Sequence, residues 1–365
     1  MSEYSEYNTP NAQRPTPNLC PKSDETIHVV LAVYDPKGTY SQHAGVVMTS
    51  IFENTKSKVT VHILHDNTLT EDNRQKFIRT AEKYSQGIEL HDVTEYFTQF
   101  SFPTYHLTIG AVYNHLTIGA VYRLVAPRIL KFEKVIYLDA DIVVNLDIKE
   151  LWDIDIGRNC IAGFHGAGFE TFSNYILDKL NGGDCHDSIN SGVMIMNLDA
   201  IRAKGDLFDD AMEWFSRRYH LAFTADQSFI NAYFTGSTNL IEKRFNFCNP
   251  SANQDIKNCI IHTPGSFKVW GMSGLPFQRL YWKYYLKSAW GENLAPEEIT
   301  DKLCDACEAS FAELSPFLHR TAHPCLKRTL IAIPKKIFWT NQLMFSLRII
   351  VKDIYYRLKH RLTHR

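Results

Sequence analysis

Two aspartates, Asp139 and Asp141, directly follow an apolar run, Val135–Leu138, and a second run, Ile142–Val144, continues after them. A short, β-branched, uninterrupted run predicts a buried strand of the parallel type. If the backbone stays extended, carboxylates two residues apart project to the same side. Burying two anions side by side is costly unless a cation lies between them, and oxygen ligands suit Mn²⁺ or Mg²⁺. Two solvated aspartates at a strand end remain the alternative.

A histidine and a lysine could complete such a site. His262 ends another predicted strand, Cys259–His262, and Lys268 follows six residues later in a turn rich in Gly and Pro. Imidazole with carboxylates favours Mn²⁺ over Ca²⁺, and the ammonium group could reach phosphate oxygens. A metal and a lysine together would stabilise a diphosphate as it leaves an activated sugar, which points to glycosyl transfer.

The elements before and after this site alternate between strands and helices. The first half predicts strand, helix, strand, helix and strand, the pattern of a doubly wound α/β fold whose ligands bind beyond the carboxyl ends of the strands. These elements cover residues 27–33, 40–52, 59–65, 70–84 (capped by Thr70) and 88–93. Further on, strands are expected at 160–164 and 189–198, one helix at 199–219 and another from Thr224, with a substrate-facing loop at 165–187.

An eight-residue segment occurs twice, as His106–Tyr113 and again as His115–Tyr122. Nine residues correspond to about two and a half helical turns, so the two copies would face opposite sides and only one could present a given face to a site. The second copy leads directly into Arg123 and the following strand. We therefore expect His115, rather than His106, to occupy the site.

In addition to this pattern, the chain resembles glycosyltransferase family 8, retaining nucleotide-sugar enzymes with a GT-A fold that include lipopolysaccharide galactosyl- and glucosyltransferases and glycogenin-like enzymes. The resemblance covers roughly residues 27–270. It rests on six motifs in the family's order: Leu31-Ala32-Val33, His115-(x7)-Arg123-Leu124, Tyr137-Leu138-Asp139-Ala140-Asp141, Asn190-Ser191-Gly192-Val193, Asp226-Gln227 and His262-(x5)-Lys268-Val269-Trp270. The implied fold is α/β: a Rossmann-like, nucleotide-sugar-binding GT-A domain with a mixed central sheet and a small, basic, helical C-terminal extension.

The resemblance implies a role for each matching residue. Asp139, Asp141 and His262 would bind Mn²⁺, with Mg²⁺ as the alternative ion. The donor, a UDP-sugar, would contact Ala32, Asp35 and Tyr40 at the uridine, Gly265 and Lys268 at the phosphates, and Arg123, Asp226, Asn190, Gln227, His115 and Ala140 elsewhere. Arg123, Asn190, Asp226 and Gln227 form the implied catalytic set. Gln227 would lie on the sugar face opposite the leaving group, and because an amide is a poor nucleophile, we favour attack by the acceptor on the leaving-group side.

Composition and charge describe a globular protein with a distinct tail. The 365 residues are 45% hydrophobic and 22% charged, and we expect a lead-in at 1–25, a catalytic domain at 26–275 and a helical basic region at 276–365. From Arg320 to Arg365 the chain holds eleven Lys or Arg and one acid. This amphipathic, aromatic-rich segment predicts contact with an anionic membrane surface, and packing on the catalytic domain is the alternative.

The tail also bears on partners and location. No nucleic-acid-binding motif accompanies its charges, so no nucleic-acid partner is expected. A signal peptide and an apolar stretch of 18 residues are both missing from the sequence, which predicts a cytoplasmic protein, peripheral on the inner face of the cell membrane. Cys304, Cys307 and Cys325, with two nearby histidines, leave a zinc set open as a minor alternative.

The sequence therefore predicts a Mn²⁺-dependent hexosyltransferase that uses UDP-glucose or UDP-galactose. The acceptor would be a saccharide or lipid-linked saccharide of the cell surface, such as a lipopolysaccharide core. A nucleotide-sugar-binding or membrane scaffold protein with a degenerate site is the non-enzyme alternative, and a hydrolase or nucleotidyltransferase on a related fold is a third.

Overall fold

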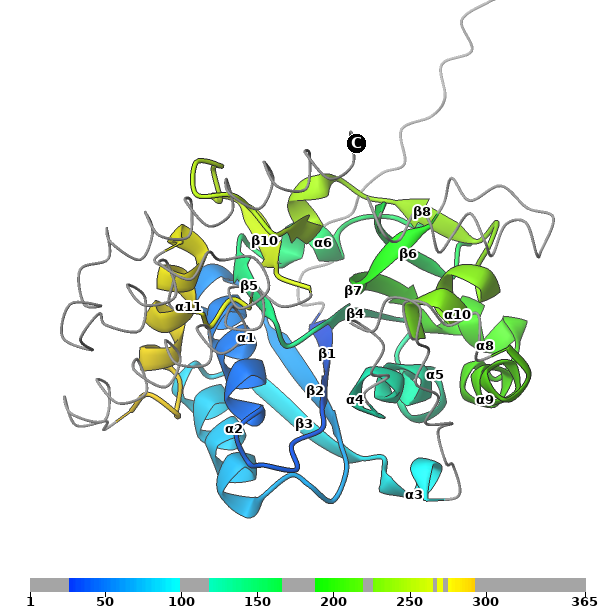
Figure 1. Cartoon of the computed structure of the whole chain (residues 1–365), viewed down its shortest axis with the longest axis horizontal. Helices are drawn as coiled ribbons and strands as arrows, with labels where there is room; N and C mark the ends of the chain where they lie inside the picture. Colours follow the sequence, from blue (N-terminus) through cyan, green and yellow to red (C-terminus); the bar gives the residue numbers. More distant parts are fainter. Residues whose placement is uncertain are drawn as a thin grey trace, which may run out of the picture.

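The computed structural model describes residues 26–98, 118–165, 188–218, 226–264, 268–271 and 275–292. Strands form a large and a small sheet, and helices cover both faces of the large one (Figure 1). Within these ranges no helix is long and apolar enough to cross a bilayer.

The large sheet has seven strands in the order β3-β2-β1-β4-β7-β6-β8. Strands β3, β2, β1 and β4 are parallel, whereas β7 is antiparallel to both β4 and β6. The expected mixed α/β sheet is thus confirmed. The strands are β1 (Ile27–Val33), β2 (Val59–His65), β3 (Gly87–Asp92), β4 (Lys134–Leu138), β6 (Ile161–His165), β7 (Ile189–Asn197) and β8 (Thr238–Leu240).

A second sheet of three strands was not expected. It contains β5 (Ile142–Asn145), β10 (Cys259–His262) and β9 (Phe247–Cys248), in the order β5-β10-β9. The run that resumes after Asp141 therefore enters another sheet, and Asp139–Asp141 form a turn between the two sheets rather than extended backbone. Strand β10 pairs antiparallel with β5, so its last residue, His262, lies opposite Ile142, next to the aspartates.

Alternation along the strands divides the core between the two faces of the large sheet. Val29 and Leu31 point to the face covered by α1, α11 and the small sheet, whereas Val30 and Ala32 point to the face covered by α5, α8, α9 and α10.

The helices are α1 (Ser41–Asn54), α2 (Glu71–Lys83), α3 (Thr94–Phe97), α4 (Ile118–Val121), α5 (Ala126–Ile129), α6 (Lys149–Trp152), α8 (Leu198–Lys204), α9 (Leu207–Arg218), α10 (Asp226–Tyr233) and α11 (Pro276–Lys287), with 3₁₀ turns η1 (Tyr122–Val125) and η4 (Lys243–Asn246).

Local capping explains where several helices begin. Thr70 caps α2 as expected, because its hydroxyl accepts a hydrogen bond from Asn73 N at 3.2 Å. The single helix expected at 199–219 is wrong: α8 ends at Lys204 and α9 begins at Leu207. Between them the Asp206 carboxylate accepts from the backbone N–H groups of Phe208 and Asp209, which starts a new helix.

The first helix after residue 275 shares the core of the sheets. On α11, Tyr281, Tyr284 and Tyr285 are each at most 2% exposed and belong to the same cluster as the residues of α1 and β5. Residues 293–365, which contain the expected basic tail and the cysteines Cys304, Cys307 and Cys325, lie outside the described part of the chain, as do residues 1–25.

Candidate active site

Two carboxylates and one imidazole meet where the two sheets join. His262 Nε2 lies 3.3 Å from Asp141 Oδ1 and 3.9 Å from Asp139 Oδ2. One ligand atom from each residue can be chosen so that all three lie within 4.8 Å of one another. His262 is 1% exposed and Asp141 is 7% exposed, whereas the side chain of Asp139 is 27% exposed, so the set is reached from solvent at Asp139. Strand pairing brings His262 to Asp141, although the two residues are far apart in sequence.

Three further observations test whether this set fits a cation. Asp141 Oδ1 is buried and receives no hydrogen bond. Gly192 leaves room for the ligands, because a Cβ at this position would approach His262 Cε1 to 2.2 Å. Asn246 Oδ1 lies 2.9 Å from His262 Nδ1, which orients Nε2 toward the carboxylates. A buried carboxylate oxygen that accepts no hydrogen bond and faces the His262 imidazole, a space kept open and an oriented imidazole fit a divalent ion such as Mn²⁺.

Lys268 adds a positive charge to the set. Its Nζ lies 2.6 Å from Asp141 Oδ2. Burial alone would raise the pKa of Asp141, but Lys268 and His262 outweigh burial and hold this pKa well below its usual range. Likewise, burial alone would lower the pKa of His262, and Asp141 outweighs it and raises that pKa to about 10. Lys268 and His262 therefore both offset the negative charge of Asp141.

We call Asp139, Asp141 and His262 the candidate metal-ligand set. Arg123, which comes from the 3₁₀ turn η1, connects this metal-ligand set to the start of α10. Its guanidinium is 2.9 Å from Asp139 Oδ1 and 3.1 Å from Asp226 Oδ2, and it donates to Ser191 O at 2.7 Å. The ring of Tyr137 lies under the guanidinium, 4.2 Å from its carbon, and the Tyr137 hydroxyl donates to Asp139. Arg123 is 3% exposed, so these contacts fix its position firmly.

The first turn of α10 supplies Asp226 and Gln227. Asp226 is 4% exposed, and burial raises its pKa to about 6 even though Arg123 opposes the shift. Gln227 Oε1 accepts a hydrogen bond from Ser191 N at 2.9 Å. The amide oxygen of Gln227 is therefore already held by the backbone of β7, and Asp226 lies beside Arg123.

Asn246 is a site residue that the sequence analysis missed. Its Nδ2 donates to Asn190 Oδ1 at 2.9 Å, and its Oδ1 faces His262 Nδ1. Asn190, from β7, is thereby linked through one amide to the imidazole of the metal-ligand set. In the sequence Asn246 stands between two phenylalanines, which gives no signal beyond that of an ordinary turn.

The residues expected at the uridine lie at the end of β1. The Asp35 carboxylate accepts hydrogen bonds from Tyr40 N, Ser41 N and Ser41 Oγ at 2.6–2.9 Å, so it holds the start of α1. The side chain of Tyr40 is exposed, and its ring meets that of Trp270 edge to face. Ala32, at 9% exposure, precedes them on β1. An exposed aromatic ring whose backbone is held by Asp35 suits stacking on a base.

Not every expected residue can be placed. Ala140 is buried in the turn between Asp139 and Asp141. His115, its repeat counterpart His106, and Gly265 lie outside the described residues. The choice between the two copies of the repeat therefore remains a prediction.

Comparisons with known proteins show which family and fold the chain resembles. The model of the family described as Glycosyl transferase family 8 matches residues 32–273. General stress protein A of Bacillus subtilis is 25% identical over 293 residues, which are 74% of this chain and 96% of that protein. A Haemophilus influenzae protein is 26% identical over 209 residues, which are 57% of this chain and 60% of its own length.

Among solved structures, the galactosyltransferase LgtC in complex with donor and acceptor sugar analogs superposes with a TM-score of 0.60 at 22% identity. The superposition covers 76% of this chain and 100% of that one. At this level of identity the likeness establishes the fold, which is of the GT-A type.

Proposed function

The chain belongs to glycosyl transferase family 8, and on that premise we propose that it transfers a hexose, glucose or galactose, from a UDP-sugar to a saccharide acceptor. The observation that carries the proposal is the convergence of ligand atoms from Asp139, Asp141 and His262 within 4.8 Å of one another, with Lys268 in contact with Asp141. When bound there, Mn²⁺ would offset the negative charge that develops on the diphosphate as the sugar leaves.

The proposed work of the side chains follows from their contacts. Arg123 is held between Asp139 and Asp226, so it keeps the buried Asp226 carboxylate near the metal-ligand set. Arg123 and Asp226 would orient the sugar hydroxyls there. Lys268 would turn from Asp141 to the phosphates when an ion takes over that carboxylate. Tyr40, whose backbone N–H is held by the Asp35 carboxylate, would stack on the uracil ring.

We further propose transfer with retention, through attack by the acceptor on the leaving-group side. Gln227 Oε1 accepts from Ser191 N, so the amide is engaged as a hydrogen-bond acceptor, and an amide is a weak nucleophile. The bond from the anomeric carbon to the diphosphate breaks as the acceptor oxygen bonds to that carbon. The acceptor proton passes to the departing phosphate, so no enzyme base is needed.

UDP release from a panel of UDP-sugars, without acceptor and with Mn²⁺ or with EDTA, tests the donor assignment. We expect slow hydrolysis of UDP-glucose or UDP-galactose that requires the metal and disappears in Asp141→Asn. The matched control Asp155→Asn, which changes an aspartate outside the site, should retain this hydrolysis. A full panel that is neither hydrolysed nor bound in Mn²⁺ would refute the proposal and favour a scaffold role.

The acceptor and the location are proposed on the sequence alone. A saccharide or lipid-linked saccharide of the cell surface, reached from the cytoplasmic side, suits a basic amphipathic tail that binds anionic lipid. Flotation of the full chain with phosphatidylglycerol vesicles, against a chain ending at residue 319, tests this. Equal flotation of both chains would contradict it.

A further inference from the structure

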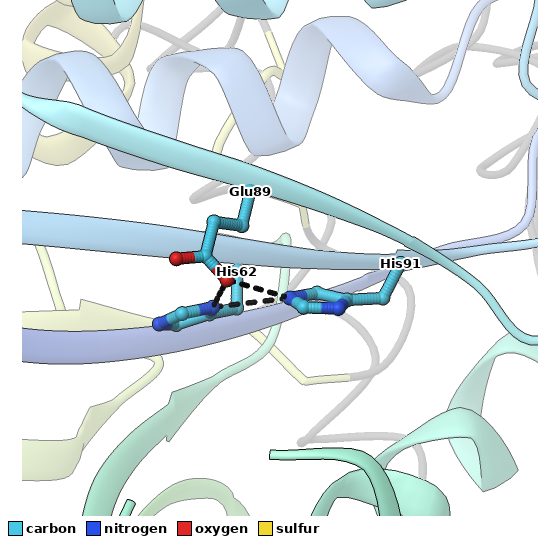
Figure 2. Close-up of side chains that lie close together, drawn as sticks. All are labelled: His62, Glu89 and His91. Carbon is cyan, nitrogen blue, oxygen red and sulfur yellow. Dashed lines mark hydrogen bonds and ion pairs between the residues drawn. The ribbon is translucent and has the colours of Figure 1, made fainter. Parts of the chain in front are cut away.

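A row of histidines crosses three neighbouring strands of the large sheet. His28 on β1, His62 on β2 and His91 on β3 follow one another, with 3.0 Å between His28 Nδ1 and His62 Nε2 and 3.1 Å between His62 Nδ1 and His91 Nε2. Glu89 on β3 turns its carboxylate to the junction of the last two rings (Figure 2). Its Oε2 is 3.4 Å from His62 Nδ1 and 3.6 Å from His91 Nε2. None of these residues belongs to the proposed donor site.

The three donor atoms of His62, Glu89 and His91 form a nearly equilateral triangle with sides of 3.1, 3.4 and 3.6 Å. Zinc binds imidazole nitrogen and carboxylate oxygen at about 2.0–2.2 Å in tetrahedral geometry, which puts neighbouring ligands about 3.3–3.5 Å apart. The triangle therefore has the dimensions of one face of a zinc coordination tetrahedron. Sheet pairing sets these dimensions, because His62 lies in register with Glu89 and Leu64 with His91.

The surroundings suit a bound ion. His62 is fully buried, whereas the side chains of His91 and Glu89 are 22% and 52% exposed, which leaves a path from solvent. His28 meets the second nitrogen of His62, and Phe132 stacks on the His28 ring at 3.6 Å between centroids. A metal-bound histidine characteristically donates its other N–H to an acceptor, and His28 Nδ1 can be that acceptor for His62.

The protonation of the rings agrees with this geometry. Burial, followed by the neighbouring His28 and His91, lowers the pKa of His62 to about 3. Burial also lowers the pKa of His91, with Glu89 opposing. Neutral rings keep a lone pair for a metal, and two imidazoles with one carboxylate are a set that zinc binds in proteins.

We propose that His62, Glu89 and His91 bind a Zn²⁺ ion that ties the edge strand β3 to β2. Among the described residues no fourth His, Cys, Asp or Glu joins the group, so water would complete the tetrahedron. Strand β3 ends the sheet, and an edge strand is held on one side only. A metal cross-link at this position would secure the edge of the catalytic fold without touching the donor site.

Zinc binding by the full chain, carrying Asp141→Asn to disable the other metal site, tests the proposal. The chain is first stripped with a chelator and dialysed, and Zn²⁺ is then added. We expect it to bind one equivalent of Zn²⁺ tightly and to have a higher Tm with zinc than without. Glu89→Gln and His91→Ala should each weaken uptake by about 10- to 100-fold and remove the Tm increase. Asp92→Asn, a neighbouring exposed carboxylate on the same strand, should change neither.

Other outcomes are equally informative. Undiminished zinc uptake in both Glu89→Gln and His91→Ala would overturn the proposal and leave a hydrogen-bonded row of histidines. Absence of tight zinc uptake in the chain that carries Asp141→Asn alone would also overturn the proposal. Glu89 is exposed, so Glu89→Gln is expected to fold even where His91→Ala does not. In an otherwise unchanged chain, Glu89→Gln should retain donor hydrolysis, which separates this result from a failure of the proposed function.

Discussion

Gly192 lies directly against the ring of His262, and the room it leaves is filled by the metal-ligand set. A Cβ at this position would come within 2.2 Å of His262 Cε1 and 2.8 Å of Asp139 Oδ2. Real side chains never approach so closely, so the imidazole or the carboxylate would have to move. The glycine is therefore a requirement of the site rather than of the backbone of β7.

Gly192→Ala should abolish Mn²⁺-dependent donor hydrolysis while the chain still folds. We expect a loss of at least about 100-fold, since displacement of a ligating group by an ångström costs this much. Gly236→Ala is the matched control, because Gly236 has φ +73° and open space around it. That variant should lose about 1 kcal/mol of stability and keep its metal. Full activity in Gly192→Ala would contradict the site as described.

Asn246→Ala should weaken Mn²⁺ binding by about 10- to 100-fold, because the amide orients the imidazole of His262. Titration of the chain with Mn²⁺, in which electron paramagnetic resonance measures the concentration of free Mn²⁺, gives the affinity. Cys248→Ala is the control, since its sulfur lies 3.9 Å from the same nitrogen and is a weak partner. Equal losses in the two variants would show that packing, and not the amide, matters.

Asp226 should make stability depend on pH. Its folded pKa of about 6 is above the unfolded value of 3.8, so the folded chain binds the proton more tightly and stability is lost as the pH rises through 6. Relative to Asp226→Asn, the unmodified chain should gain about 1 kcal/mol between pH 7 and pH 5. Urea unfolding of both chains in EDTA measures the difference. A difference that is the same at both pH values would contradict the raised pKa.

Lys268→Ala should change metal binding and turnover in opposite directions. Lys268 Nζ lies 2.6 Å from Asp141 Oδ2 and competes with a cation for this carboxylate, so removal of Lys268 should tighten the binding of Mn²⁺ alone several-fold. With donor, the lost phosphate contact should slow hydrolysis by about 100-fold. Calorimetry with Mn²⁺ alone, together with UDP release, separates the effects, and Lys76→Ala on α2 should alter neither. A loss of both would place Lys268 in a purely structural role.

Much of the large sheet could be predicted because its strands are continuous apolar runs. Strands β1 and β2 begin and end at the expected residues, Ile27–Val33 and Val59–His65. The small sheet was missed because the chain changes sheets within the turn at Asp139–Asp141, which contains no glycine or proline. Two apolar runs separated by three residues look like one interrupted strand.

Residue types revealed part of the site, and tertiary contacts account for the rest. Carboxylates after a buried strand, a histidine ending another and a nearby lysine stand out in the sequence because such groups are costly to bury without a purpose. Asn246 does not, because its role depends on a contact with His262 that only the pairing of β10 creates. The same holds for His62 and His91, whose relation requires the register of β2 and β3.

The turn from Asp139 to Asp141 belongs to both sheets at once. Asp139 N donates to Gly192 O in the large sheet, and Thr263 N, just past the small sheet, donates to Asp141 O. An ion held by this turn and by His262 would add a cross-link between the two sheets. A ligand that binds the folded chain and not the unfolded one reduces the fraction of molecules in which the two sheets open. Proteases cut the opened form, so a bound ion at this joint would also slow proteolysis of the chain.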